Sequence, residues 1–237
     1  MELLQPPTAS RLVQGRALWA LAGLLAMRGE FHQAREHLAG FRAIYEELGQ
    51  TLWLAISMVE GIIELLADDP AAAEAQLRPG VNALLEMGEH GYLCTKAAWL
   101  ARALYEQGRH EEAEEFTRVS EDAAADDDYS AQVALRSIRA KVLAQGGEMG
   151  LALRLADEAV ALANLTDDPT LRGDALMDQA TVLRLAGRVP AARAAIEEAL
   201  AHFEAKGNLV SARRAKKRLT EAQLAHQRQR RLRADQG

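Results

Sequence analysis

Apolar residues along most of the chain recur at intervals of three and four, the spacing of one face of an α-helix. In residues 11–28 the positions that follow this rule are Leu18, Leu21, Ala22 and Leu25. Gly29 ends this first helix and Gly49 ends a second one, because glycine readily adopts the left-handed conformation with which a chain leaves a helix. The pattern therefore predicts a pair of helices over residues 11–49.

The same pair of helices recurs with a nearly fixed period. Five reference alanines lie 39, 40, 39 and 40 residues apart: Ala34, Ala73, Ala113, Ala152 and Ala192. Five residues before each of them is a helix breaker: Gly29, Asp68, Gly108, Gly147 or Gly187. Twelve residues before each is a small residue: Ala22, Gly61, Ala101, Ala140 or Ala180. Fifteen residues after each is a second breaker or cap: Gly49, Gly88, Asp128, Asp167 or Gly207. Self-similarity at a fixed period indicates a repeat architecture, in which the small residues let paired helices approach closely.

Two helices of about 16 residues and two short turns account for this period. We therefore expect an all-α array of five long helical hairpins after an extended leader at 1–10, with a basic capping helix and tail at 208–237. The expected hairpins are residues 11–49, 50–88, 89–128, 129–167 and 168–207.

Two stretches depart locally from the pattern. Glu60 and Glu64 occupy places that hold leucine in the first and third hairpins. The apolar stripe of that helix is Leu52, Ile56, Val59, Ile63 and Leu66, which predicts a helix that has rotated rather than buried its glutamates. Pro79 and Gly80 fall inside a predicted helix at 71–87, where a proline costs about 3 kcal/mol, and predict a kink or break.

Composition supports a helical, non-membrane class. Apolar residues make up 49% of the 237 residues and aromatic residues only 5%, which suits helices better than strands. No run approaches the roughly 18 apolar residues of a membrane span. The first ten residues lack the pattern of a secretion signal, and the single cysteine, Cys94, excludes an internal disulfide framework. We therefore expect a cytoplasmic protein, with Cys94 a small core-side residue.

Charge is distributed unevenly. The net charge is −6, but the segment from Lys206 to the C-terminus holds ten basic residues opposed only by Glu221 and Asp235. Three interpretations remain open for this basic end: a solvated cap of the array, a contact with an acidic partner or with the acidic body of a second copy, or nucleic-acid binding. The last is disfavoured because the segment lacks interleaved aromatic residues and any recognisable DNA-reading motif.

The helix pairs, with a small residue, a glycine and an alanine at fixed offsets, resemble the tetratricopeptide repeat (TPR), whose usual period is 34. Three stretches resemble more specifically the C-terminal TPR region of bacterial, actinobacterial-type multidomain proteins. These stretches are ARALYEQGRHEEAEEFTRVSEDAAADDD at 101–128, SAQVALRSIRAKVLAQGG at 130–147 and EALAHFEAKGNLVSARRAKK at 198–217. The multidomain proteins carry an adenylate/guanylate cyclase domain and an AAA-type ATPase module before their repeats, and related arrays occur in LuxR-type ATPase regulators. The resemblance covers roughly residues 11–220.

The resemblance implies a right-handed α-α superhelix that binds a partner protein or peptide in its concave groove, as a regulatory scaffold in bacterial signalling. The alternative is a ligand- or peptide-sensing module of a transcription regulator. No cyclase or nucleotide-binding residue can be carried over, because the chain has no cyclase domain and no G-x-x-x-x-G-K-[ST] motif.

Residue patterns typical of catalysis or metal binding are missing. No two of the six histidines share a helix face at the spacing of zinc ligands. The acidic run Glu121, Asp122, Asp126, Asp127 and Asp128 lacks the glycine and distal glutamate of an EF-hand loop, and no G-x-S-x-G motif occurs. We therefore expect a non-enzymatic protein without a cofactor or metal.

The TPR resemblance implies that the first helix of each hairpin lines the groove. The repeat register then gives nine candidate partner-binding residues: Arg16, Trp19, Thr95, Arg102, Tyr105, Lys141, Met177, Thr181 and Arg184. Among them, Arg102, Lys141 and Arg184 could form a cationic track for an acidic peptide or a C-terminal carboxylate.

Overall fold

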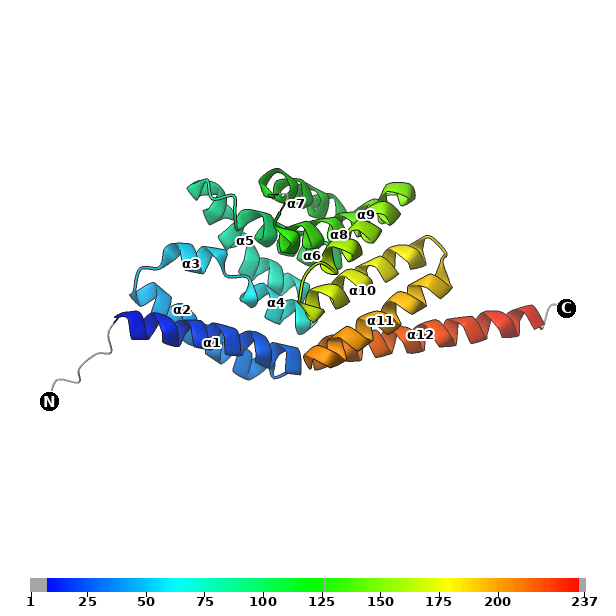
Figure 1. Cartoon of the computed structure of the whole chain (residues 1–237), viewed down its shortest axis with the longest axis horizontal. Helices are drawn as coiled ribbons and strands as arrows, with labels where there is room; N and C mark the ends of the chain where they lie inside the picture. Colours follow the sequence, from blue (N-terminus) through cyan, green and yellow to red (C-terminus); the bar gives the residue numbers. More distant parts are fainter. Residues whose placement is uncertain (1–7, 126, 235–237) are drawn as a thin grey trace. The chain divides into compact units, whose positions relative to one another are not determined.

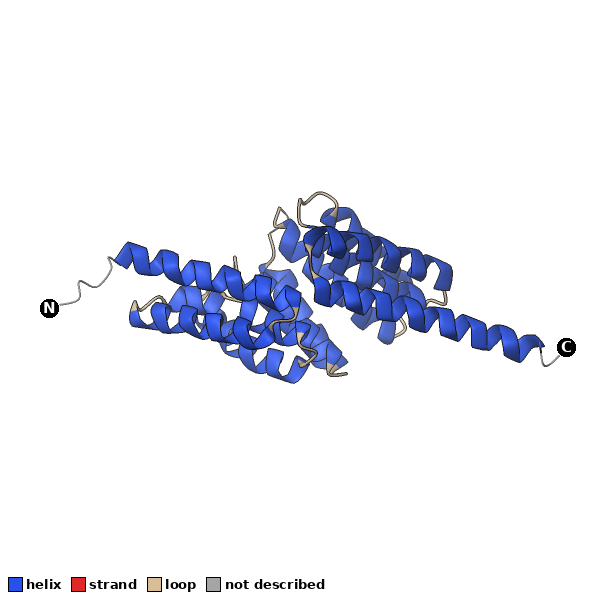
Figure 2. Ribbon diagram, turned by 90° about the horizontal axis from the view of Figure 1, so that it is seen from below, coloured by secondary structure: helices blue, strands red, loops and turns tan. Residues whose placement is uncertain are grey.

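The computed structural model describes residues 8–125 and 127–234, with side chains for 10–125 and 127–222. All regular secondary structure within these ranges is α-helical, which confirms the all-α class (Figures 1 and 2). Residues 1–7 of the predicted leader, Asp126 of the acidic run and residues 235–237 of the predicted tail lie outside the described residues. The helices are α1 (Thr8–Arg28), α2 (Phe31–Glu47), α3 (Thr51–Ile56), α4 (Val59–Leu66), α5 (Pro70–Met87), α6 (Leu93–Glu106), α7 (His110–Ala123), α8 (Tyr129–Gln145), α9 (Met149–Ala163), α10 (Pro169–Leu185), α11 (Val189–Lys206) and α12 (Leu209–Ala234).

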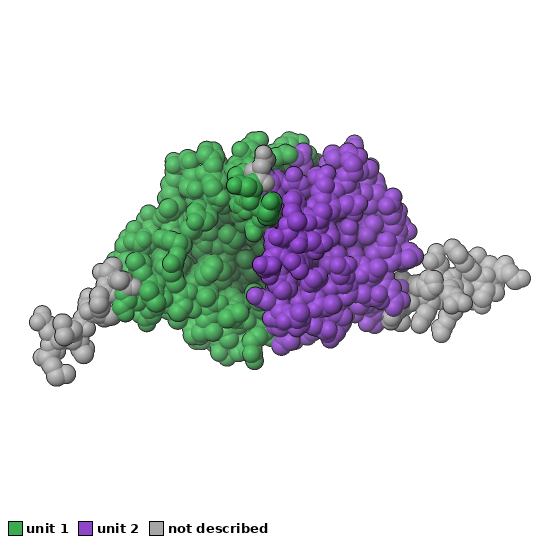
Figure 3. All heavy atoms as spheres, in the orientation of Figure 1, with its two compact units in different colours: residues 1–131 green, residues 132–237 purple. Residues whose placement is uncertain are grey.

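The chain forms two compact units, residues 1–131 and 132–237 (Figure 3). In unit 1, α1 packs against α2, α5 against α6, and α6 against α7. The first helices of successive hairpins also meet, since α4 packs on both α1 and α6. In unit 2, α10 packs against α9 and α11, and α12 packs against α11. Within the described residues, every helix is too short or too polar to cross a bilayer.

The predicted breakers lie where helices end. Gly29, Gly108, Gly147 and Gly187 all have positive φ, as do Gly49, Gly88 and Gly207. Asp68 takes the same left-handed conformation, with φ of 67°, and no other non-glycine residue in the described part does so. The next residue, Asp69, caps α5 by accepting a 2.9 Å hydrogen bond from the Ala72 amide. The turn that lacks a glycine therefore keeps the same backbone geometry.

Adjacent glycines between α8 and α9 test whether this conformation matters. Gly147 has φ of +91°, whereas Gly146 has ordinary backbone and no neighbour closer than 3.6 Å to an added Cβ. Gly147→Ala should lower the free energy of unfolding by about 1–2 kcal/mol, because a side chain strains the left-handed region. Gly146→Ala should be neutral or stabilise by up to about 1 kcal/mol. Urea unfolding followed by circular dichroism measures both, and equal effects would contradict the account.

The small residues predicted at the helix crossings are buried. Ala22, Ala101 and Ala140 are fully inaccessible to solvent, and Ala180 nearly so. At the matching place in α4, a Cβ added to Gly61 would overlap the Leu77 side chain of α5. These residues therefore let paired helices come closer than larger side chains would permit.

Two expectations for the second hairpin are wrong, the break at Pro79 and the outward glutamates of α4, whereas a kink at Pro79 stays a prediction. The helix around Pro79 is not broken, because α5 runs without interruption from Pro70 to Met87. Leu77, Val81 and Leu84 are fully buried on both sides of the proline, and their burial outweighs the roughly 3 kcal/mol cost of an internal proline. The break occurs instead in the preceding helix, between α3 and α4, at Ser57 and Met58.

The glutamates of α4 are also not rotated outward. Glu60 is 3% exposed and Glu64 is 8% exposed. Glu64 accepts hydrogen bonds of 2.8 and 2.6 Å from Arg35 of α2. Each buried carboxylate is tolerated because a cation from a neighbouring helix pairs with it; the partner of Glu60 is described below.

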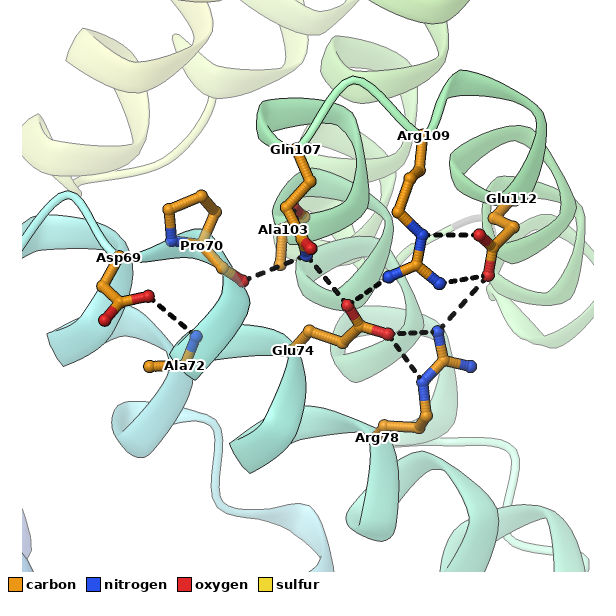
Figure 4. A network of polar contacts seen from close by, with 9 residues as sticks. All are labelled: Asp69, Pro70, Ala72, Glu74, Arg78, Ala103, Gln107, Arg109 and Glu112. Carbon is orange, nitrogen blue, oxygen red and sulfur yellow. Dashed lines mark hydrogen bonds and ion pairs between the residues drawn. The ribbon is translucent and has the colours of Figure 1, made fainter.

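A polar network joins α5 to the turn before α7 (Figure 4). The Glu74 carboxylate accepts hydrogen bonds from Gln107 at 2.9 Å, from Arg109 at 2.5 Å and from Arg78 at 2.6 Å. Arg109 also donates to both oxygens of Glu112, at 2.5 Å each. Burial raises the pKa of Glu74, but the hydrogen bonds from Gln107 and Arg78 and the charge of Arg109 together lower it below its ordinary value.

Because the pKa of Glu74 is lowered in the folded state, we predict that part of the free energy of unfolding is lost at acidic pH. Because the folded state holds the Glu74 proton more weakly than the unfolded chain, the stabilisation is complete above about pH 4.3 and is lost as pH falls through the folded pKa. The difference in unfolding free energy between wild type and Glu74→Gln should therefore be largest at pH 7 and shrink towards pH 3. Urea titrations at pH 7, 5, 4 and 3 measure it. Glu115→Gln, at an exposed position of α7, is the control, and a difference independent of pH would contradict the prediction.

Candidate binding surface

Three residues of the first two hairpins form an exposed aromatic and cationic surface in unit 1. Arg16 and Trp19 belong to α1, and Trp53 belongs to α3. The Arg16 guanidinium carbon lies 4.6 Å from the centre of the Trp53 ring. Trp19 is 37% exposed and Trp53 is 38% exposed. We call these three residues the Trp–Arg surface.

Buried neighbours fix the positions of the two tryptophan rings in the Trp–Arg surface. The Trp53 ring makes an edge contact with Tyr45, whose ring centre is 6.4 Å away and whose side chain is 1% exposed. The Trp19 indole N–H donates a 3.1 Å hydrogen bond to the Ser57 hydroxyl. Both rings thus have one fixed side and one side open to solvent. The stacked arginine keeps its N–H groups available, because no carboxylate in the described part of the chain pairs with Arg16.

The break between α3 and α4 positions this surface, and a buried lysine stabilises the break. Lys96 of α6 is 0% exposed. Its ammonium donates to the backbone oxygens of Ala55, at 2.7 Å, and of Ser57. These two carbonyls are left without helical partners where α3 ends. A positive charge at a helix C-terminus is also favourable.

The same lysine lies 3.4 Å from the Glu60 carboxylate, which accepts a 2.5 Å hydrogen bond from the Ser57 hydroxyl. A continuous polar chain therefore runs from the Trp19 indole through Ser57 and Glu60 to Lys96. Burial lowers the pKa of Lys96, and the charge of Glu60 acts in the opposite direction. Gly80 of α5 makes room for this cation, because an added Cβ would overlap the Lys96 ammonium.

The α6 candidates lie on one helix but in different surroundings. Arg102 stacks over the Trp99 ring at 5.3 Å, and both side chains are half-buried. Tyr105 contacts the His110 ring, with centres 4.9 Å apart. Thr95 lies 3.7 Å from the sulfur of Cys94. Cys94 itself is 1% exposed, and burial raises the pKa of its thiol, which agrees with the predicted core position.

The unit 2 candidates divide between the core and the surface. Lys141 is 2% exposed and forms a 2.9 Å ion pair with Asp178, which is 5% exposed. A ligand could reach Lys141 only if this pair opened. Met177 packs on the α10–α11 core, and the Thr181 hydroxyl accepts a 3.0 Å hydrogen bond from Arg218 of α12. Arg184, at the end of α10, is exposed.

Sequence reasoning missed Trp53, Trp99 and the Glu60–Lys96 pair. The register could have revealed the pair. The place of Lys96 holds alanine, isoleucine or leucine in every other hairpin, and the place of Glu60 holds leucine in the first and third. A lysine and a glutamate at apolar positions of neighbouring first helices indicate a buried ion pair.

In the described part of the chain, no group of three or more His, Cys, Asp or Glu side chains is placed to hold a metal ion. Searches with protein-family models and against curated proteins find no match to the chain.

Proposed function

We propose that the protein is a non-catalytic binding module of the TPR type, which holds a segment of a partner protein on the first helices of its hairpins. The Trp–Arg surface is the observation that carries the proposal. Tryptophan and arginine are the residues that contribute most often to binding hot spots, because they combine a large apolar area with directed donors. Two partly exposed tryptophans, one of them with an arginine stacked on its ring, form the kind of exposed aromatic patch that marks interaction sites.

The chemistry of the surface favours a peptide with an aromatic or aliphatic side chain next to a carboxylate. The rings of Trp19 and Trp53 would hold the apolar side chain. Arg16 would hold the carboxylate, since a cation on an aromatic ring can still donate to an anion and no described carboxylate pairs with it. The body of the chain up to residue 204 carries 32 acidic and 18 basic residues, so it repels acidic segments elsewhere and favours this site. The resemblance to repeat regions of bacterial signalling proteins supports a regulatory role.

The test uses random peptides displayed on phage and selected on the immobilised full chain. Peptides with a carboxylate beside an apolar residue should be enriched on wild type. Synthetic copies should bind Arg16→Glu at least tenfold more weakly, as expected for a lost charge-assisted contact of about 1.5–3 kcal/mol. Arg154→Glu, a charge reversal at an exposed position of α9, is the matched control and should bind like wild type. Equal binding to wild type and Arg16→Glu would overturn the proposal.

A further inference from the structure

The outer side of α1 carries an apolar seam that no described residue of unit 1 covers. Its residues are Val13, Ala17, Ala20 and Leu24, which follow one helix face at intervals of four, three and four. Val13 is 68% exposed and Leu24 is 53% exposed, and both alanines are also exposed. None of the four is polar. We call them the α1 seam.

The repeat register shows what kind of surface this is. Ala17, Ala20 and Leu24 lie 17, 14 and 10 residues before the reference alanine Ala34. The equivalent residues of the other hairpins lie at the same offsets from their own reference alanines. In the second hairpin they hold Ile56, Val59 and Ile63, which are 7%, 8% and 0% exposed. In the fifth they hold Ala175, Asp178 and Val182, which are 2%, 5% and 0% exposed. The positions that are open in α1 are therefore closed in the second and fifth hairpins.

Within each unit, the preceding hairpin closes these positions. Val59 and Ile63 share a core cluster with Ala26 of α1 and Leu38 of α2. Val182 shares one with Ala144 of α8 and Ala156 of α9. The α1 seam thus holds the positions through which the later hairpins pack on the hairpin before them, and no described residue covers these positions on α1. Its natural occupant is another helix with small and aliphatic residues.

We propose that the occupant is α1 of a second copy of the chain, packed antiparallel. The seam is self-complementary under a twofold axis that passes between Ala17 and Ala20. Such an axis places Val13 opposite Leu24 of the other copy, and Ala17 opposite Ala20. The central alanines let the two helices approach closely while the larger side chains fill the ends.

Charges do not oppose this pairing. Within the described residues of α1 there is no acidic side chain, and two of its three arginines are already compensated. Arg28 pairs with Glu30 and Arg11 pairs with Glu47. Arg16 stacks on Trp53 at the edge of the seam. One helix pair buries less than the roughly 1,200–2,000 Å² of stable interfaces, so we expect a dissociation constant of about 10–100 µM.

Sedimentation of the full chain between about 1 and 200 µM tests the association. The average mass should rise towards that of a dimer for wild type and remain that of a monomer for Leu24→Glu. Leu165→Glu, at a position of unit 2 that is 65% exposed, should dimerise like wild type. Circular dichroism before sedimentation verifies that both variants are folded. A wild-type monomer at all concentrations, or a dimer unaffected by Leu24→Glu, would overturn the proposal.

Disulfide trapping tests the orientation. Under mild oxidation, an equal mixture of Val13→Cys and Leu24→Cys should give the mixed dimer. Val13→Cys alone should give at least tenfold less dimer, because its two cysteines would lie roughly 16 Å apart along the antiparallel helices. The native Cys94 is buried and does not compete. Efficient trapping of Val13→Cys with itself, and none in the mixture, would overturn the antiparallel arrangement.

Discussion

Replacing Lys96 with methionine is expected to lower the free energy of unfolding of unit 1 by about 3–5 kcal/mol. The lysine is fully buried, and the substitution removes a charged donor from three groups. Two are the backbone oxygens of Ala55 and Ser57, and the third is the buried carboxylate of Glu60. The loss of the pair costs more than the loss of lysine packing, because methionine keeps most of the side-chain volume.

Tryptophan fluorescence reports this change selectively. The chain has three tryptophans, and Trp19, Trp53 and Trp99 all lie in unit 1. Denaturant unfolding followed by fluorescence should show a large shift for Lys96→Met. Lys206→Met, at an exposed position of α11, should change the free energy by no more than about 0.5 kcal/mol. A cost below about 1 kcal/mol for Lys96→Met would show that the buried pair does not stabilise the break.

The double variant Glu60→Gln with Lys96→Met isolates the pair. If the carboxylate is destabilising only when it has lost its cation, the double variant should be at least about 1 kcal/mol more stable than the sum of the two single losses predicts. Simple additivity would mean that the two side chains act independently.

Phe203→Ala is expected to lower the stability of unit 2 by about 3–5 kcal/mol. Phe203 of α11 is 1% exposed and belongs to a core cluster of that unit, with Leu176 and Ala199. Its ring fills the space that Gly173 leaves on α10, where an added Cβ would lie 2.5 Å from the ring. Removal of the ring opens a cavity that the fixed helices cannot fill by collapse.

Hydrogen exchange measured by mass spectrometry locates this effect. Peptides from α10 and α11 should exchange much faster in Phe203→Ala than in wild type. Leu209→Ala is the control, because Leu209 is 50% exposed and should leave exchange in α10 nearly unchanged. Unaltered protection of α10 and α11 in Phe203→Ala would contradict the packing described for unit 2.

The helix ends could be predicted from the sequence because their cause is local. A glycine with positive φ, such as Gly108 or Gly187, ends a helix almost wherever it occurs in such a pattern. The place of Asp68 in the register was informative even without glycine, because the period identified it as a breaker. Fixed spacing therefore predicted the hairpin turns better than residue type alone.

The interruptions inside helices could not be predicted, because their cause is tertiary. Pro79 predicts a break by itself, but buried residues on both sides keep α5 continuous. Nothing local marks Ser57 as the end of α3. The break there depends on Lys96, which is 39 residues away and donates to the carbonyl that the break exposes.

Part of the candidate site could be predicted from the repeat register. The register placed Arg16 and Trp19 among the partner-binding residues, and the structure brings them to the same surface as Trp53. The register also selected Lys141, which forms a buried ion pair with Asp178. Helix periodicity identifies which residues share a face but does not distinguish a solvated cation from a paired one. The cationic track of Arg102, Lys141 and Arg184 stays a prediction, and charge reversal at Arg102 and Arg184 together tests it.

The central claim is that the Trp–Arg surface is where a partner segment binds. Hydrogen exchange of the full chain with and without a phage-selected peptide tests it most directly. We predict added protection in peptides that cover α1 and α3, around Arg16 and Trp53, and unchanged exchange in the second helices α2, α5 and α7. Protection confined to those second helices or to unit 2, with α1 and α3 unchanged, would contradict the claim.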